Sequence, residues 1–322
     1  MMIYVKIKYI SCFFILLLIL SNCGQQQTNN NHKLIIFHAG SLSVPLKEVI
    51  ELFNKEYPEI SILTEAAGSR DCARKITDLK KECDVMASAD YTVIDQLLIP
   101  DHASWNIHFA SNEMVIVYHD EEQSFRKIDS TNWFNILLND EIKYGRSEPN
   151  ADPCGYRTVL VAKLAEKYYN IPGFASKLMA KDQQYIRPKE TDLLALFETN
   201  TVDFIFIYRS IAEQHGLKYL TLPDAINLKS SKFTEEYSSV TVDLSGREPG
   251  SIITQIGEPM VYGITIPTNA PNKSTAIKFV DFLLSDKGMA IMEKNGQPSI
   301  VPSYSDSFQN IPVSLKKYAL KK

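Results

Sequence analysis

The stretch LIIFHAGSLSVPLKEVIELFNKEY, residues 34–57, contains one complete strand, turn and helix. Its first four residues are apolar, as expected of a buried strand, and Gly40 in the following turn allows the main chain to come close to a ligand. Apolar residues then recur at helical spacing, Pro45 suits the first helical turn, and Ser43 can cap the helix. The stretch therefore predicts a helix that starts at the carboxyl end of a strand.

Similar strand and helix patterns follow along the whole chain. Residues 60–64 and 84–88 have the pattern of short strands, each followed by a turn of small residues and an amphipathic helix. Such alternation predicts mostly parallel sheets covered by helices on both faces, so the expected class is α/β. Residues 224–258 are polar, and we expect them to be irregular. The other predicted strands are 114–118, 142–145, 202–208 and 260–266, and the predicted helices are 71–79, 92–98, 133–138, 156–169, 191–198, 273–284 and 286–294.

The order of these elements predicts two lobes. We define lobe I as residues 33–112 plus 259–322, and lobe II as residues 113–258. The strand at 114–118 leads out of lobe I, and the C-terminal helices most simply return to it. Two crossing segments of this kind form a hinge, and we expect the ligand cleft to lie between the lobes.

Residues 1–23 have the pattern of a secretory signal peptide, with two lysines, no acid and an apolar run shorter than the roughly 20 residues that span a membrane. The sequence LSNC at its end resembles a bacterial lipobox, in which Cys23 is lipidated and becomes the new N-terminus. Asn22 is larger than the residue usually found there, and a plain signal peptide is the alternative. Residues 24–32 are nearly all polar and predict a flexible tether. We therefore expect an extracytoplasmic, membrane-anchored lipoprotein.

Charge and cysteine content narrow the class of the exported chain. Without the leader, 32 basic and 38 acidic side chains remain, and this net charge of −6 argues against nucleic acid as a partner. Three cysteines remain, and the predicted helix of about ten residues between Cys72 and Cys83 holds them beyond disulfide reach. The sequence contains no CxxC or HExxH motif, so we expect no zinc site. It also indicates no cofactor, and we expect a monomer.

Ser41 and Ser69 occupy equivalent places, because each follows a strand and a glycine and precedes a helix. Ligands of open α/β sheets bind beyond the carboxyl ends of strands, where helix N-termini present unpaired N–H groups. Two such turns favour an anion, which an acidic chain must capture with local, preorganised donors. The alternative is that both serines are ordinary helix caps.

Six motifs, in this order, resemble those of the archaeal-type tungstate/molybdate-binding proteins of ABC transporters. The resemblance covers essentially everything after the tether. It implies a type II periplasmic-binding-protein fold that closes on one tetrahedral oxyanion and delivers it to an ABC permease, without catalysis. The motifs are HAGSL (38–42), AAGSRDCARKI (66–76), ASADY (87–91), DPCGYR (152–157), RPKETDLL (187–194) and IYRSIAEQHGLKYL (207–220).

The resemblance also implies a set of ligand-binding residues. In this family a carboxylate approaches the metal, because tungsten and molybdenum can expand beyond four oxygen ligands whereas sulfur in sulfate cannot. Asp152 matches that carboxylate, and capping of the next helix is its alternative role. For a second carboxylate Glu213 is a candidate, since the position before Tyr208 holds Ile207. The expected donors are Ser41 and Ser69, beside Gly40, from lobe I, and the Cys154 and Thr191 N–H groups and the Tyr208 phenol from lobe II.

Two alternatives remain open. Phosphate carries a proton at neutral pH, which Asp152 can accept, whereas tungstate and molybdate are fully deprotonated. An extracellular hydrolase would use Cys154 as a thiolate, or Asp152 and Glu213 as a glycosidase pair. No histidine is close to Cys154 in the sequence, and no GxSxG motif is present. The candidate bases in that alternative are His38, His108, His119 and His215.

Overall fold

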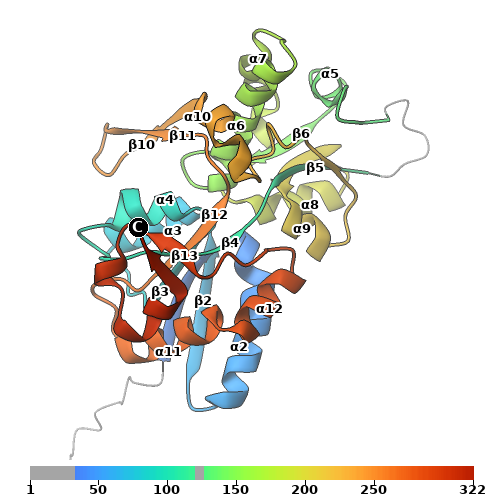
Figure 1. Cartoon of the computed structure of the whole chain (residues 1–322). Helices are drawn as coiled ribbons and strands as arrows, with labels where there is room; N and C mark the ends of the chain where they lie inside the picture. Colours follow the sequence, from blue (N-terminus) through green and yellow to red (C-terminus); the bar gives the residue numbers. More distant parts are fainter. Residues whose placement is uncertain (1–32, 120–126) are drawn as a thin grey trace, which may run out of the picture. The chain divides into compact units, whose positions relative to one another are not determined.

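Two five-stranded sheets organise the chain, which the computed structural model describes for residues 33–119 and 127–322 (Figure 1). The predicted signal peptide at 1–23 with its lipidation site Cys23, and the tether at 24–32, lie outside the described residues and stay predictions. Within the described residues, no helix is long and apolar enough to cross a membrane.

The first sheet, sheet A, belongs to lobe I and has the order β2-β1-β3-β12-β4. β1 pairs in parallel with β2 and β3, whereas β12 runs antiparallel to both β3 and β4. The prediction of a mostly parallel sheet is confirmed, because the strands β2, β1, β3 and β4 of this sheet run in one direction and β12, which returns from the other sheet, runs against them. The strands are β1 (Lys33–Ala39), β2 (Ser61–Ala67), β3 (Val85–Ser88), β4 (Ile107–Ser111) and β12 (Val261–Thr265).

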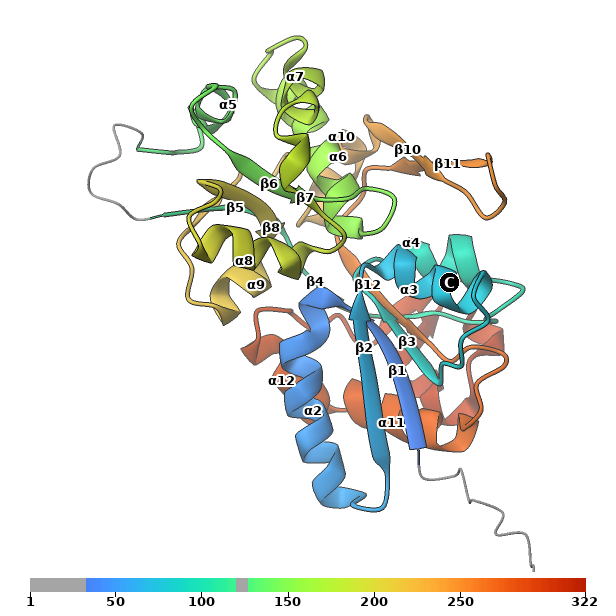
Figure 2. The same ribbon diagram turned by 180° about the vertical axis from the view of Figure 1, so that it is seen from behind.

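Helices cover both faces of sheet A, as the alternation of side chains in β1 requires. Leu34 and Ile36 belong to the hydrophobic core on the side of α2, whereas Phe37 belongs to a second core on the side of α3. Figure 2 shows α2 beside β1 and β2. The helices of lobe I are α2 (Ser43–Glu56), α3 (Ser69–Thr77), α4 (Tyr91–Val93), α11 (Lys273–Leu284) and α12 (Asp286–Lys294), with a π-helical turn η3 (Ile94–Leu98) after α4.

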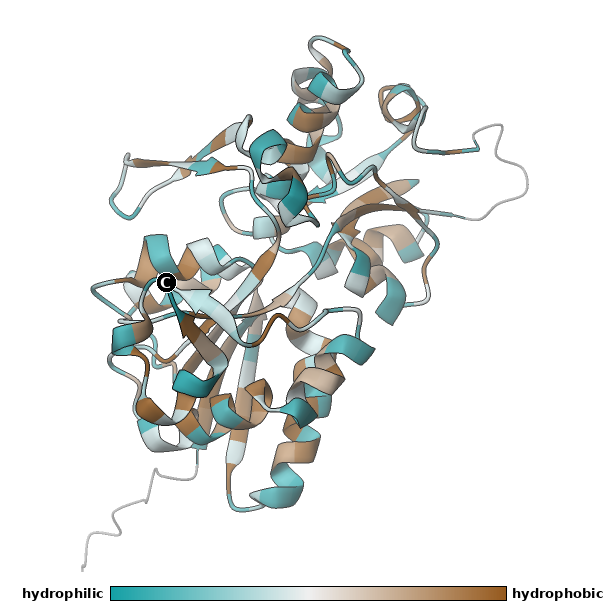
Figure 3. Cartoon of the chain, in the orientation of Figure 1, coloured by the Kyte–Doolittle hydropathy of each residue, from teal (hydrophilic) through white to brown (hydrophobic). Residues whose placement is uncertain are grey.

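The second sheet, sheet B, belongs to lobe II and has the order β7-β6-β8-β5-β9. It is also mixed: β6 is parallel to β7 and β8, and β5 is antiparallel to β8 and β9. Apolar residues lie along β5 and β8, which are buried on both faces (Figure 3). Its elements are β5 (Met114–Tyr118), β6 (Tyr144–Ser147), β7 (Ile186–Arg187), β8 (Phe204–Tyr208), β9 (Tyr219–Thr221), α5 (Trp133–Leu137), α6 (Pro153–Tyr168), α7 (Phe174–Ala180), α8 (Leu193–Glu198) and α9 (Arg209–Gln214).

Two neighbouring segments connect the sheets. The chain leaves sheet A at the end of β4, passes through Asn112 and Glu113, and enters sheet B as β5. It returns to sheet A as β12, which pairs with β4 at Val261 and Ser111. The α/β fold with two sheets is confirmed, and movement of the lobes about these two segments stays a prediction.

Two local predictions are wrong. Residues 224–258 are not irregular, since they contain α10 (Thr234–Ser238) and a hairpin of β10 (Thr241–Ser245) and β11 (Ile252–Ile256). Each hairpin strand has only one fully buried residue, although Val242 and Leu244 of β10 alternate with polar side chains in the manner of a strand. Ser43 does not cap α2, because a 3₁₀ turn at Gly40–Leu42 continues directly into the helix.

Short elements complete the chain. The 3₁₀ turns η5 and η6 precede α8 and α10, and the C-terminal residues form a two-stranded parallel sheet of β13 and β14. These elements are η2 (Gly40–Leu42), η4 (Gln183–Tyr185), η5 (Glu190–Asp192), η6 (Ser231–Phe233), β13 (Ser303–Ser305), η7 (Phe308–Asn310), η8 (Val313–Tyr318) and β14 (Ala319–Lys321).

Candidate functional site

The two glycine-containing turns of lobe I lie so close to lobe II that a side chain at either glycine would clash with it. A Cβ atom on Gly40 would lie 2.8 Å from Thr191 Oγ1 and 3.1 Å from Glu190 Oε2. A Cβ atom on Gly68 would lie 2.3 Å from the carbonyl oxygen of Ala151. Glycine is therefore required at both turns by close approach rather than by an unusual backbone angle. We call the buried contact between these turns and lobe II the junction.

Ser41 and Ser69 lie on these turns but cap no helix. Ser41 belongs to the 3₁₀ turn η2, and Ser69 is the first residue of α3, whose N-cap is Gly68. Neither helix start has a side-chain capping hydrogen bond. Both serines are buried. The interpretation of these residues as ordinary caps is therefore wrong.

Asp152 and Glu190 form a pair of carboxyl groups in the junction, and both side chains are 0% exposed. Asp152 is the N-cap residue of α6 and makes no side-chain capping hydrogen bond, but the Cys154 N–H in the first turn of that helix acts on its carboxyl group, so helix capping stays the alternative role of this residue. Among the described residues, three carboxylate oxygens of this pair have no hydrogen-bond partner, namely both oxygens of Asp152 and Oε2 of Glu190. Since buried polar atoms nearly always have partners, these oxygens make the junction the candidate ligand site.

The pKa of each carboxyl group is raised in this arrangement. Burial, and then the charge of Glu190, raise the pKa of Asp152 well above its ordinary value. Burial also raises the pKa of Glu190, while the Ser41 N–H, which donates to Glu190 Oε1 at 2.6 Å, acts in the opposite direction. Two buried carboxyl groups close together cannot both ionise without compensation. The pair can therefore accept a proton from a ligand or contact an electron-poor centre.

Three hydroxyl groups supply hydrogen-bond donors. Ser41 Oγ accepts from the Tyr262 hydroxyl at 3.0 Å, and Ser69 Oγ accepts from the Ala89 N–H at 3.0 Å. Tyr208 Oη accepts from Arg157 Nη1 at 3.1 Å. A hydroxyl has one proton and also accepts, so each of these groups keeps its own proton for another acceptor. They add donors to the junction without adding net charge.

The structure brings most of the predicted site residues together. The Cys154 N–H acts on the Asp152 carboxyl group and lowers its pKa, and the Tyr208 phenol is within the electrostatic range of Asp152 and Glu190. The role of these residues in binding stays a prediction. Residues placed in the junction are Gly40, Ser41, Ser69, Asp152, Cys154, Thr191 and Tyr208.

Glu213 is not part of the junction pair. Its side chain is 37% exposed, it forms an ion pair with Arg209 at 3.3 Å, and it accepts from the Tyr219 hydroxyl. The carboxylate beside Asp152 is Glu190, which the sequence analysis missed. The available signal was its position next to Thr191, a residue already expected in the site. Ser147 was also missed, although its buried hydroxyl acts on the Asp152 carboxyl group and lowers its pKa.

A buried ion pair crosses the junction beside these groups. Arg157 Nη2 lies 2.8 Å from Asp90 Oδ2, and both side chains are 2% exposed. Tyr156 donates its hydroxyl proton to the same carboxylate at 2.6 Å, and Arg157 also donates to the Ala89 carbonyl. Because Asp90 belongs to lobe I and the other two to lobe II, these bonds hold the lobes together.

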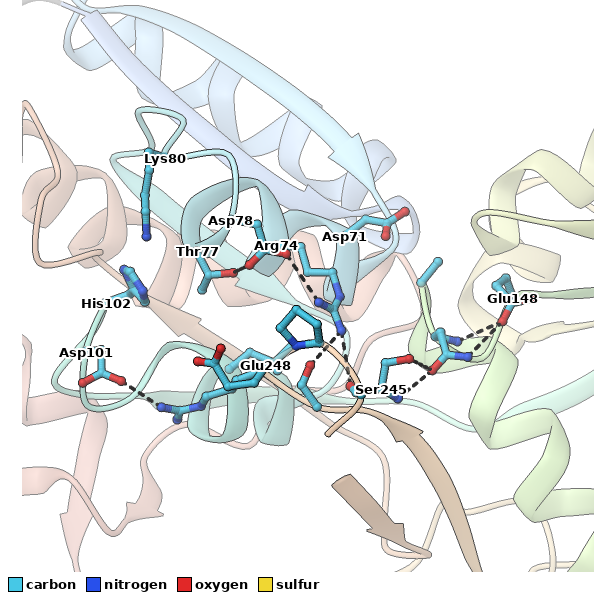
Figure 4. A pocket seen from close by; sticks show the side chains of 17 residues that line it. Asp71, Arg74, Thr77, Asp78, Lys80, Asp101, His102, Glu148, Ser245 and Glu248 are labelled. Carbon is cyan, nitrogen blue, oxygen red and sulfur yellow. Dashed lines mark hydrogen bonds and ion pairs between the residues drawn. The ribbon is translucent and has the colours of Figure 1, made fainter. Parts of the chain in front are cut away.

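A pocket of about 820 Å³ opens elsewhere between the lobes, between α3 and the β10–β11 hairpin (Figure 4). Arg74 donates there to the Ser245 and Gly246 carbonyls, and Arg247 pairs with Asp101 at 3.0 Å. The charges around the pocket are of both signs and its arginines are already paired. It therefore lacks the convergent free donors of the junction.

The hydrolase alternative loses its nucleophile. Cys154 is 0% exposed, its Sγ–H donates to the Phe206 carbonyl, and burial raises its pKa well above the ordinary value. The charged groups that act on it are Asp152, Glu190 and Arg157, with no histidine among them. In the described part of the chain, no group of three or more His, Cys, Asp or Glu residues can hold a metal ion.

Two sheets joined by two crossing segments, with buried polar groups between them, are the architecture expected of a solute-binding protein. The family described as bacterial extracellular solute-binding protein matches residues 34–297, and the chain belongs to this family. It is 50% identical over 287 residues to a solute-binding protein of Petrotoga mobilis, with 89% of each chain covered. It is 38% identical over 339 residues to the molybdate/tungstate-binding protein WtpA of Pyrococcus abyssi, with 97% and 96% covered.

A solved structure shows the same fold. The periplasmic molybdate-binding protein of Azotobacter vinelandii superposes with a TM-score of 0.61 at 16% identity, over 82% of this chain and 98% of that one. The resemblance seen in the six motifs is thereby confirmed at the level of family and fold.

Proposed function

We propose that this solute-binding protein captures tungstate or molybdate for an ABC transporter. In this proposal Cys23 carries a lipid that tethers the protein to the membrane, and the monomer delivers the oxyanion to the permease subunits without catalysing a reaction. Closure of the lobes sequesters the ligand, and the permease recognises the closed form. The name of the Pyrococcus abyssi relative, which matches nearly the whole chain, supports this choice of ligand.

One observation carries the choice: the unpartnered oxygens of Asp152 and Glu190 lie among the donors of the junction. The Ser41, Ser69 and Tyr208 hydroxyls have free protons for the oxygens of an oxyanion. A carboxylate, by contrast, repels a dianion unless it contacts the central atom. Tungsten and molybdenum can accept such additional oxygen ligands, and sulfur in sulfate cannot, so the pair suits the two metals.

Phosphate is the second candidate, and the same carboxyl pair favours it. Hydrogen phosphate presents an O–H group that needs an acceptor, and the unpartnered oxygens of Asp152 and Glu190 can accept it. Sulfate offers neither a proton nor an expandable centre. The carboxyl pair therefore argues against sulfate and leaves phosphate as the competitor.

Calorimetric titration of the purified protein with tungstate, molybdate, phosphate and sulfate tests the proposal. We expect one ligand per chain and the tightest binding for tungstate or molybdate. Tight binding of phosphate or sulfate without binding of either metal oxyanion would overturn the assignment.

A further inference from the structure

A chain of buried hydrogen bonds at the crossing segments has a fixed direction. It begins at Asn112, which connects β4 to β5 and is 3% exposed. Asn112 Oδ1 accepts from the Glu113 N–H at 2.9 Å and from the Ser210 N–H at 3.4 Å. Because main-chain N–H groups can only donate, they fix which end of the amide is the oxygen and which is the nitrogen.

The Asn112 nitrogen then determines the role of Tyr262, a 0% exposed residue of β12. Asn112 Nδ2 donates to Ser210 Oγ at 2.7 Å and to Tyr262 Oη at 2.9 Å, which uses both of its protons. Gln297 Nε2 donates to the Ser41 carbonyl at 2.8 Å and lies 3.5 Å from the same phenol oxygen. The phenol therefore accepts from amide nitrogen and keeps its own proton to donate.

The acceptor of that proton is Ser41 Oγ, 3.0 Å away. Since Ser41 Oγ receives a proton from Tyr262, its own proton must point elsewhere. The Ser41 N–H donates to Glu190 Oε1 at 2.6 Å, so Ser41 lies directly against the carboxyl pair. The direction set by the Glu113 N–H at the crossing segment and the Ser210 N–H of α9 is thus transmitted through Asn112 and Tyr262 to the junction.

We propose that Asn112 and Tyr262 are positioning residues that hold Ser41 as a hydrogen-bond donor toward the bound oxyanion and so disfavour ligands that present an O–H group there. This inference rests on the proposed function. A fully deprotonated tungstate or molybdate oxygen accepts the Ser41 proton. An O–H group of hydrogen phosphate in the same place would face the Ser41 hydroxyl proton and find no acceptor, because the Ser41 oxygen already accepts the hydrogen bond from Tyr262.

A double-mutant cycle separates this role from a merely structural one. Tyr262→Phe, Ser41→Ala and the double variant are titrated with tungstate and with phosphate at neutral pH. We expect Tyr262→Phe to weaken tungstate binding about 10-fold, the effect of roughly one hydrogen bond. In the Ser41→Ala background the same substitution has no further effect. The ratio of tungstate to phosphate affinity falls in Tyr262→Phe.

Tyr144→Phe is the matched control, since Tyr144 is also 0% exposed and donates its hydroxyl proton to the Leu178 carbonyl within lobe II. It should leave both affinities unchanged. Additive losses in the cycle, or an unchanged ratio in Tyr262→Phe, would overturn the inference. If Tyr262→Phe does not fold, Asn112→Asp serves instead, because it replaces the donor by an acceptor and should lower the same ratio.

The wild-type titration distinguishes the two failures. A wild-type protein that binds neither tungstate nor molybdate contradicts the proposed function. A wild-type protein that binds them, with additive losses in the cycle, contradicts only the role of Asn112 and Tyr262.

Discussion

The two lobes meet in two ways, and the difference separates a binding site from a closing contact. At the junction, Asp152 and Glu190 are fully buried and three of their oxygens have no partner. At the hairpin, Arg247 and Asp101 are paired at 3.0 Å with side chains 36% and 67% exposed. Pairing two exposed charges changes the free energy of folding little, whereas a buried charged or polar group without a partner is destabilising. A buried polar group without a hydrogen-bond partner is therefore a better indicator of a ligand site than an exposed ion pair is.

The largest expected effect comes from the buried arginine of the junction. Arg157→Met removes one partner of the ion pair with Asp90 and leaves a carboxylate buried without its charge partner. Such a loss costs about 3 to 5 kcal/mol. Thermal or urea unfolding of the ligand-free protein measures it. A change below about 1 kcal/mol would mean that this pair behaves like a surface one.

The next effect concerns the carboxyl pair. Asp152→Asn and Glu190→Gln each keep the shape of the side chain but remove the negative oxygen that can contact tungsten or molybdenum. We expect a loss of about 100-fold in tungstate affinity, the scale on which groups around a metal change its binding.

Sulfate and an exposed acid provide the controls for this experiment. Sulfate binding, however weak, should not fall in the two variants, because its central atom takes no additional ligand. Glu213→Gln, at an exposed acid paired with Arg209, should leave tungstate affinity unchanged. Equal losses for tungstate and sulfate would contradict contact between the carboxylates and the metal.

A partly buried carboxyl group within range of the Arg157–Asp90 ion pair, that of Glu258, should also make stability depend on pH. Burial, and then the charge of Asp90, raise the pKa of Glu258 from 4.5 to about 7. A carboxyl group with a raised pKa in the folded state contributes stability that is complete below pH 4.5 and is lost as the pH rises through about 7. We expect the protein to lose about 2 kcal/mol from this group between pH 5 and pH 8.

Glu258→Gln tests this dependence, because the amide does not titrate. The unfolding free energy of the variant should fall less between pH 5 and pH 8 than that of the wild type. Burial also raises the pKa of Asp95, to about 6, so part of the dependence should remain. Identical pH profiles for the two proteins would assign the effect to other groups.

The smallest effect is expected at the hairpin. Arg247→Met is the same substitution as in the junction, but its ion pair with Asp101 is largely exposed. We expect a change in unfolding free energy of about 0 to 1 kcal/mol. A loss as large as that of Arg157→Met would remove the distinction between the two contacts.

Local patterns predicted local structure well. The strand and helix of residues 34–57 appear as β1 and α2, because their apolar spacing and glycine turn lie within one short segment. The direction of β12 was not predictable in this way, since it depends on which sheet the chain comes from. The β10–β11 hairpin was missed because it lies in a mostly polar segment and each of its strands has only one fully buried side chain.

The site shows the same division. Ser41 and Ser69 were found because a strand, a glycine and a helix start mark them in the sequence. Glu190 was not, because it lies 38 positions from Asp152 and only the fold makes them neighbours. The direction of the Tyr262 hydrogen bond likewise depends on residues from β12, the crossing segment and α9.

The turn at Gly68 sets how near the two halves can come. A single methyl group there would overlap the Ala151 carbonyl, which lies 2.3 Å from its position, and would act as a wedge. Because that carbonyl immediately precedes Asp152, the wedge would also separate the acid from the serine that follows the glycine. The absence of a side chain at Gly68 thus sets how closely the two lobes approach each other in this structure.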